Sequence, residues 1–179
     1  MKNIESKIAL KLIKEGQILR NVEISDKLDL SKLEIKSNYE VNEKISIMDC
    51  EIEYLMVHSS TFLEKIELKN CKINTAYFGG GYFPKGFEMK DCKFSSSVSF
   101  EAGGHNLKTD FIIENNLFKG FVDFLDCWFK GPFILKNNIF EVGSNIFVED
   151  TQESSTFDDS IISQNNIGDL KQKRANNQV

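Results

Sequence analysis

Apolar and polar positions alternate in five short segments that recur through the middle of the chain. These segments are ISIMDCEI (45–52), IELKNCKI (66–73), FEMKDCKF (87–94), FIIENNLF (111–118) and FILKNNIF (133–140), and their starts are 21, 21, 24 and 22 residues apart. Alternation with a period of two is typical of β-strands, and the i, i+3, i+4 spacing of a helix does not occur in them. A strand pattern that recurs at such a period predicts a solenoid in which each repeat forms one coil.

Corresponding positions of the five segments define two columns in such a solenoid. Stacked coils lie about 4.8 Å apart, so each side chain lies above its counterpart in the next coil. The large apolar column, which predicts the core, consists of Ile52, Ile73, Phe94, Phe118 and Phe140. The second column consists of Cys50, Cys71, Cys92, Asn116 and Asn138, and stacked asparagines can satisfy their amides along the axis. We therefore predict an all-β fold, a parallel β-helix of about six or seven coils.

A shorter period and two weaker copies extend this pattern. Within residues 118–140 the large apolar residues are Phe118, Phe124, Phe129, Leu135 and Phe140, at steps of 6, 5, 6 and 5. Leu28 and Leu30 lie 22 residues before Cys50 and Ile52 and predict an earlier coil. The segment SIISQNNIG (160–168) predicts a later one. The glycines at 79–81 and 103–104 are expected at coil corners, where their φ freedom is needed.

The two ends of the chain have different patterns. Residues 4–15 place Ile4, Ile8, Leu10, Leu12 and Ile13 on a rough helical stripe, with Gly16 as a stop. A short helix over the first coil would cover an open sheet edge, whereas a membrane-surface helix would need a broader basic face. Residues 168–179 are polar and without periodicity. We expect a cap helix at 1–17, a β-helix solenoid at 18–168 and a flexible polar tail at 169–179.

Composition excludes several classes of function. The chain has 179 residues, a net charge of −5 and two histidines. The acidic balance argues against direct nucleic-acid binding through phosphate neutralisation. No apolar run approaches the length of a membrane span, and the charged N-terminus has no signal-peptide core. We expect no metal and no cofactor.

The four cysteines follow the repeat and not the spacing of a metal site. Cys50, Cys71 and Cys92 are 21 residues apart, and no CxxC pair is present. Each follows an Asp or an Asn in the same local context. We interpret them as small buried side chains with free thiols, in agreement with a cytoplasmic location.

The segment FKGFVDFLDCWFKGPFILKNNIF (118–140) resembles the degenerate pentapeptide-repeat family, in which Phe or Leu recurs near every fifth position. The opening IKEGQILRNVEISDKLDLSKLEI (13–35) is similar to the first coil of such proteins. The resemblance implies a right-handed β-helix, here with 21–24 residues per coil, and it implies no catalytic residues. Both a three-sided and a four-sided coil are compatible with the spacing.

Three functions fit such a fold. A non-enzymatic protein-interaction module would use the flat faces of a rod, which suit a protein partner better than a small molecule. A DNA mimic acting on a topoisomerase is the first alternative, although Met48, Lys69, Lys90, Glu114 and Lys136 form a net basic column. A carbohydrate-active β-helix enzyme is the second, and it needs paired carboxylates. The candidate carboxylates are Asp123, Asp126, Glu149, Asp150, Asp158 and Asp159, and Asp123 and Asp126 are expected to lie in a solvated outer row.

The candidate partner-binding residues lie in the least periodic stretches, 53–65, 74–86, 101–110 and 141–159. Binding residues are often found in such loops on a rigid scaffold. Tyr77 and Tyr82 flank the glycines at 79–81 beside Phe78 and Phe83, and part of this cluster must be core. His58 and His105 occur in polar surroundings. We therefore predict that Tyr77, Tyr82, His58 and His105 contact a protein partner.

Overall fold

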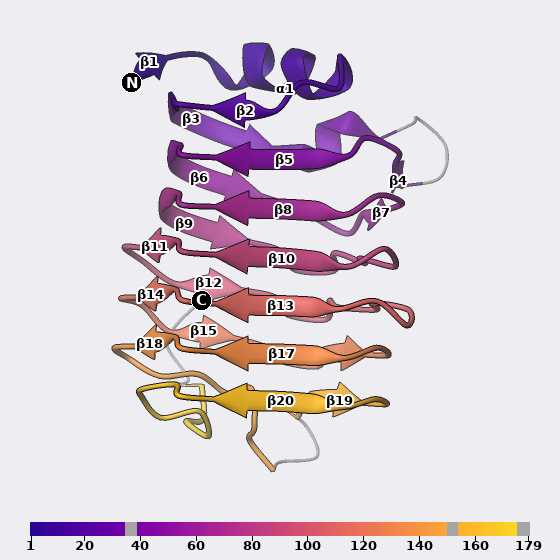
Figure 1. Cartoon of the computed structure of the whole chain (residues 1–179), viewed down its shortest axis with the longest axis vertical. Coiled ribbons are helices and arrows are strands. Elements are labelled where there is room, and N and C mark those ends of the chain that lie inside the picture. The colour runs from indigo at the N-terminus through magenta and orange to yellow at the C-terminus, as the bar shows by residue number, and fades with distance from the viewer. Residues whose placement is uncertain (35–38, 150–153, 175–179) are drawn as a thin grey trace.

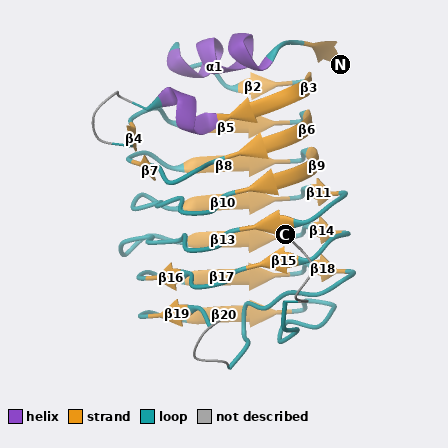
Figure 2. Ribbon diagram, turned by 180° about the vertical axis from the view of Figure 1, so that it is seen from behind, coloured by secondary structure: helices purple, strands orange, loops and turns teal. Residues whose placement is uncertain are grey.

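The computed structural model describes residues 1–34, 39–149 and 154–174 and shows a parallel β-solenoid of about six turns (Figure 1). One short helix lies at its N-terminal end (Figure 2). All strand pairs of the described residues are parallel, as stacked coils require. The predicted all-β solenoid is confirmed.

Two large sheets form most of the wall. The front sheet in Figure 1 contains β2 (Leu19–Arg20), β5 (Ile45–Met48), β8 (Ile66–Lys69), β10 (Phe87–Lys90), β13 (Phe111–Glu114), β17 (Phe133–Lys136) and β20 (Ile161–Gln164). The second sheet contains β1 (Lys2–Asn3), β3 (Val22–Asp29), β6 (Glu51–Met56), β9 (Lys72–Tyr77), β11 (Lys93–Phe94), β14 (Leu117–Phe118) and β18 (Ile139–Phe140), together with β12 (Val98–Ser99) and β15 (Val122–Asp123). Short strands elsewhere pair as β4 (Glu40–Val41) with β7 (Thr61–Phe62) and β16 (Trp128–Phe129) with β19 (Thr156–Phe157).

A repeated corner joins each front strand to the second sheet. The first corner residue always has a left-handed backbone, with φ between 51° and 57°. These residues are Asn21, Asp49, Asn70, Asp91, Asn115, Asn137 and Asn165. Asn and Asp adopt this conformation more readily than other non-glycine residues. The Asp or Asn before each column residue is therefore explained by backbone geometry.

The predicted apolar column forms part of the core. Ile52 pairs with Ile73, Ile73 with Phe94, Phe94 with Phe118, and Phe118 with Phe140. The ring centroids of Phe94 and Phe118 lie 5.0 Å apart, and those of Phe118 and Phe140 lie 4.9 Å apart. The rings are nearly parallel, so the column is a continuous aromatic stack in the later coils.

The second predicted column lies at the corner and is also buried. Cys50, Cys71 and Cys92 are each 1% exposed, and all four cysteines are free thiols. The Cys92 backbone N–H donates to Asn116 Oδ1 at 2.9 Å. The predicted later copy is confirmed by Asn166, whose Oδ1 accepts from Asn138 Nδ2 at 3.0 Å.

The N-terminal helix α1 (Ser6–Lys14) lies over the first coil (Figure 2). Ala9 and Ile13 are fully buried against the solenoid, and Leu10 and Leu12 are partly buried against the same core. The predicted apolar stripe is partly wrong, because Ile8 is 43% exposed and points away from the core. Strand β1 precedes the helix and pairs with β3, a pairing that the sequence did not predict.

The predicted register of the first coil is wrong. Ile24, and not Leu30, pairs with Ile52, and Leu28 pairs with Leu55. A register shift between Ile24 and Lys27 inserts an extra residue into β3, and the short 3₁₀ helix Leu30–Leu33 follows that strand. The first coil is therefore longer than the later ones, and a fixed offset of 22 residues misplaces its strands.

The segment from residue 169, predicted to be a flexible tail, contacts the solenoid over its described part. Ser144 N donates to Asp169 O at 2.8 Å, and Phe147 N donates to Leu170 O at 2.9 Å. Arg174 Nη1 lies 3.3 Å from Asp123 Oδ2. Contacts of the solenoid therefore extend beyond the predicted boundary at 168 to Arg174, and residues 175–179 lie outside the described residues.

Candidate functional site

The four predicted partner-binding residues form two pairs on either side of the glycine corner at 79–81. His58 and Tyr77 form the first pair, with ring centroids 6.1 Å apart. Burial, with a smaller contribution from the Glu101 carboxylate, raises the pKa of Tyr77. Tyr82 and His105 form the second pair, with ring centroids 3.9 Å apart and an interplanar angle of 30°.

The second pair is part of a larger group that includes Trp128. The rings of His105 and Trp128 lie 5.5 Å apart with an edge contact at 64°. We call Tyr82, His105 and Trp128 the aromatic row. Tyr82 and Trp128 are each 40% exposed, whereas the neighbouring Phe83 and Phe129 are fully buried. Tyr82 and Trp128 are therefore the outward neighbours of core phenylalanines.

Backbone pairing fixes the aromatic row. Tyr82 bridges to Gly104, and Gly104 bridges to Trp128. Gly104 has φ of +102°, and a Cβ there would lie 2.8 Å from the Trp128 carbonyl oxygen, so the position requires glycine. The Trp128 indole Nε1 donates to Asp158 Oδ2 at 2.8 Å. These constraints hold the three rings in place without a bound partner.

Trp128 was not among the residues predicted from the sequence. Trp128 falls between the core positions Phe124 and Phe129 of the apolar period, so that period does not mark it. The spacing contains the signal, because Tyr82, His105 and Trp128 are 23 and 23 residues apart, close to one coil. A search for exposed aromatic residues at the coil period would have found the row.

A shallow cavity of about 540 Å³ adjoins the aromatic row. We call it the lysine cavity, and it is lined by Pro84, Lys85, Leu107, Lys108, Thr109 and Lys130. Lys130 links the two features, because its Nζ lies 4.0 Å from the centre of the Trp128 ring. Leu107 is 52% exposed at this cavity, a large apolar side chain left in contact with water.

The loop that carries Leu107 is held by a buried asparagine. Asn106 Nδ2 donates to Thr109 O at 2.7 Å and to Pro132 O at 3.1 Å. Its Oδ1 accepts from Gly131 N at 3.4 Å. Asn106 is fully buried, so the loop conformation that exposes Leu107 and Lys108 is built into the fold.

The environment of His105 lowers its pKa. Burial disfavours the imidazolium, and the positive charge of Lys130 acts in the same direction. The ring is therefore neutral at physiological pH and contributes an apolar surface with one N–H donor to the aromatic row. The fixed positive charge of this face comes from its lysines.

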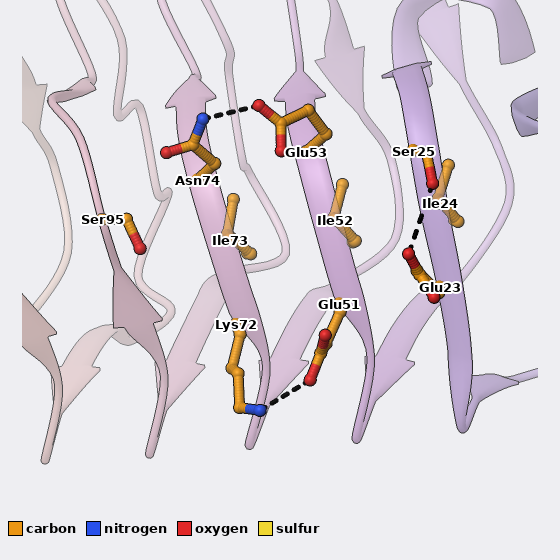
Figure 3. Close-up of a pocket in the computed structure, with 10 residues that line it drawn as sticks. All are labelled: Glu23, Ile24, Ser25, Glu51, Ile52, Glu53, Lys72, Ile73, Asn74 and Ser95. Carbon is orange, nitrogen blue, oxygen red and sulfur yellow. Dashed lines mark hydrogen bonds and ion pairs between the residues drawn. The ribbon is translucent and has the colours of Figure 1, made fainter. Parts of the chain in front are cut away.

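A second, polar groove lies on the outer face of β3, β6 and β9 (Figure 3). Its side chains pair with one another across adjacent strands. Lys72 Nζ lies 2.6 Å from Glu51 Oε1, and Asn74 Nδ2 donates to Glu53 Oε1 at 2.7 Å (Figure 3). Because these polar groups already have partners, the groove fits a role in holding coils together better than a role in binding.

Three of the described candidate carboxylates are engaged by other side chains. Asp123 is buried, which corrects its expected place in a solvated row, and it accepts from Asn145 Nδ2 at 2.7 Å. Glu149 pairs with Lys171 at 2.6 Å, and Asp158 accepts from Trp128. Asp126 and Asp159 are exposed, and Asp150 lies outside the described residues.

Searches for metal sites and membrane spans gave no candidates in the described part of the chain. Residues 1–34, 39–149 and 154–174 contain no group of three or more His, Cys, Asp or Glu side chains placed to hold a metal ion. The one α-helix of those residues is too short and too polar to cross a membrane.

Comparisons with known proteins place the chain in no known family. No protein-family model matches it, and neither a curated protein nor a solved structure matches it significantly. The assignment of a function therefore depends on the geometry of the chain itself.

Proposed function

We propose that this protein is a non-enzymatic interaction module that binds a protein partner through the side face carrying the aromatic row and the lysine cavity. The observation that carries the proposal is the row itself. Tyr82 and Trp128 are exposed yet fixed on a rigid scaffold, beside the exposed Leu107. Tyr and Trp are enriched among the residues that dominate binding energy at interfaces.

The rigidity of this face favours binding. A side chain that becomes ordered on binding costs about 0.5–1.5 kcal/mol of affinity. The rings of the aromatic row are already ordered by each other, by the backbone bridges and by Asp158. These side chains therefore lose little further conformational freedom on binding, and their contacts with a partner can contribute directly to affinity.

The charge pattern weighs against the DNA-mimic alternative. A mimic needs a continuous negative stripe, but the outward column of the front sheet runs Met48, Lys69, Lys90, Glu114 and Lys136. Lys90 lies 3.3 Å from Glu114 and 3.2 Å from Glu88, so charges on this face neutralise each other. The enzyme alternative lacks support for a similar reason, since Asp123, Glu149 and Asp158 each have a structural partner.

The proposal also includes membership of the degenerate pentapeptide-repeat family and a cytoplasmic location. The half-unit steps from Phe118 to Phe140 correspond to buried positions of the coil, which supports a degenerate pentapeptide-repeat protein. The four buried free thiols support a reducing compartment such as the cytoplasm. Neither point changes the expected mode of binding.

The experiment compares partner recovery by two matched double variants in the native host. Tyr82→Ala with Trp128→Ala removes the exposed parts of the row, and Ile139→Ala with Ile167→Ala removes exposed apolar side chains elsewhere. We expect a specific partner to be recovered by the wild type and the second variant but not by the first, at unchanged melting temperature. The recovered partner must then bind purified wild-type protein. Equal recovery by both variants would refute the proposal.

A further inference from the structure

We infer that the partner presents an acidic segment with an apolar side chain to the aromatic row and the lysine cavity. This inference rests on the proposed function and names the chemistry of its partner. It follows from three features of the face, namely the orientation of its rings, its unpaired lysines and its exposed leucine.

One face of each aromatic ring in the row is already covered by a neighbour. Tyr82 and His105 cover one another at 3.9 Å, and the Lys130 ammonium covers a face of Trp128. Binding of a sugar by stacking requires a free aromatic face, and these contacts reduce the number of free faces in the row. An aromatic ring is negative on its face and positive at its edge. The edge of Trp128 already donates its Nε1–H to the Asp158 carboxylate, so an acidic group is a chemically compatible neighbour of the row.

Three lysines add to this positive character. Lys85, Lys108 and Lys130 line the cavity, and none of them forms an ion pair with a carboxylate of the described residues. Two lysines near the front sheet differ from them, because Lys65 is paired with Glu88, and Lys90 is paired with Glu88 and Glu114. On a chain with a net charge of −5, the lining of the lysine cavity contains three lysines and no carboxylate. Charge complementarity therefore points to an acidic partner.

The apolar part of the cavity determines the rest of the partner's chemistry. Pro84 and Leu107 lie among the three lysines, and Asn106 holds the Leu107 loop in place. An apolar side chain between carboxylates would bury Leu107 while its neighbours pair with the lysines. A purely acidic polymer would leave Leu107 exposed, so the mixed segment is the better fit.

The test uses two fluorescently labelled, capped peptides that both lack tryptophan. One is glutamate-rich with a single central leucine, and the other replaces each glutamate with serine. We expect saturable binding of the acidic peptide by anisotropy, weakened by added salt. The single Trp128 should report the same binding through its emission. The serine peptide should bind at least about tenfold more weakly.

Two triple variants with the same net charge supply the control. Lys85→Gln, Lys108→Gln and Lys130→Gln should lower affinity for the acidic peptide at least about tenfold. Lys69→Gln, Lys93→Gln and Lys119→Gln, on exposed positions elsewhere, should leave it within about twofold. Equal losses in both triples, or no binding of the acidic peptide at all, would overturn the inference.

The remaining outcomes separate this inference from the proposed function. If the serine peptide binds as well as the acidic one and Trp128→Ala abolishes both, the face is an interaction site whose partner is not acidic. If the partner recovered from the host remains bound to the Tyr82 and Trp128 double variant, the proposed function fails whatever the peptides do. An oligosaccharide such as cellotetraose, titrated into the wild-type protein, should leave the Trp128 emission unchanged. Saturable binding of the oligosaccharide would also overturn the inference.

Discussion

Asn138 Oδ1 accepts two hydrogen bonds from Asn116, one from its backbone N–H at 2.9 Å and one from its side-chain Nδ2 at 3.0 Å. Asn138 Nδ2 in turn donates to Ile113 O at 2.9 Å and to Asn166 Oδ1 at 3.0 Å. One buried amide thus joins three successive coils at the corner. This arrangement explains why asparagine can replace cysteine in the later copies of the column.

Asn138→Ala should destabilise the protein by about 2–4 kcal/mol, because it leaves the buried backbone N–H of Asn116 without its acceptor and removes one of the two acceptors of the Asn116 side-chain Nδ2. Chemical denaturation followed by circular dichroism measures this loss. Asn42→Ala, at an exposed position, is the control and should change stability by less than about 0.5 kcal/mol. A loss in the first variant no larger than in the control would mean that the ladder contributes nothing.

Phe118→Ala should cost about 3–5 kcal/mol, because it opens a cavity between two stacked rings. Phe118 is fully buried between Phe94 and Phe140. The neighbouring Leu117 points outward and is only partly buried, so Leu117→Ala should cost about 1 kcal/mol or less. Equilibrium unfolding of both variants checks the expected difference, and similar costs would contradict the in/out assignment of the column.

The stacking of coils explains why much of this fold could be predicted from sequence. In parallel, in-register coils the spacing between Phe94, Phe118 and Phe140 translates directly into a column. The register of the first coil was predicted incorrectly, because a register shift after Ile24 breaks the correspondence between sequence spacing and position in the column. The contacts after residue 168 were not predicted, because they are made by backbone groups and by Arg174. The apolar period of the sequence does not indicate such contacts.

The candidate site was less predictable for a physical reason. Outward positions are not constrained by core packing. The sequence pattern therefore indicates that these residues lie in loops, but it does not show which of their side chains contact each other. Tyr82 and His105 do stack, but His58 and Tyr77 form a separate pair. Trp128 is brought to the other two rings by the backbone bridges through Gly104, and Lys130 is brought to Trp128 by a cation–π contact. Neither arrangement can be read from the order of residues along the chain.

Arg174→Ala should destabilise the protein by about 1–2 kcal/mol, a value reduced from that of a fully buried pair because Arg174 is partly exposed. The loss follows because the carboxylate of Asp123 is nearly buried and would lose its cation. Lys171→Ala removes the exposed pair with Glu149 and should cost less than about 0.5 kcal/mol. Thermal unfolding of both variants distinguishes them, and a flexible segment at 169–174 would make both changes neutral.

The buried thiols should react slowly in the native state. Burial raises the pKa of Cys127, while Cys50 has its pKa raised by the neighbouring Cys71 thiol and by burial. For Cys71, the contact with Cys50 lowers the pKa, but Cys92 and burial outweigh it and raise the pKa to about 12. Because the thiolate is the reactive form, a thiol reagent should label these sites only after unfolding. Rapid native labelling would place the cysteine column outside.

The same shifts make stability depend on pH in the alkaline range. The folded-state pKa values lie above the unfolded value of 9.0, so the unfolded chain loses thiol protons first as pH rises. Stability from the thiols is therefore full below pH 9.0 and declines above it, by up to about 1.4 kcal/mol per thiol and pH unit. Unfolding of the wild type and of a Cys50→Ala, Cys71→Ala variant at several pH values should show a steeper decline in the wild type. Parallel curves would contradict this assignment.

His105 should titrate below its ordinary pKa of 6.5, because burial and Lys130 both disfavour the imidazolium. As pH falls, the ring beside Trp128 gains a charge, and the emission of this single tryptophan should change with a midpoint below 6.5. A lowered folded pKa also means that stability from neutral His105 is present above the unfolded pKa and is lost as pH falls. His105→Gln should abolish the emission change, and His58→Gln, distant from Trp128 along the chain, should preserve it. Lys130→Gln should move the midpoint upward, and a midpoint above 6.5 in the wild type would mean that His105 is solvated and does not belong to the aromatic row.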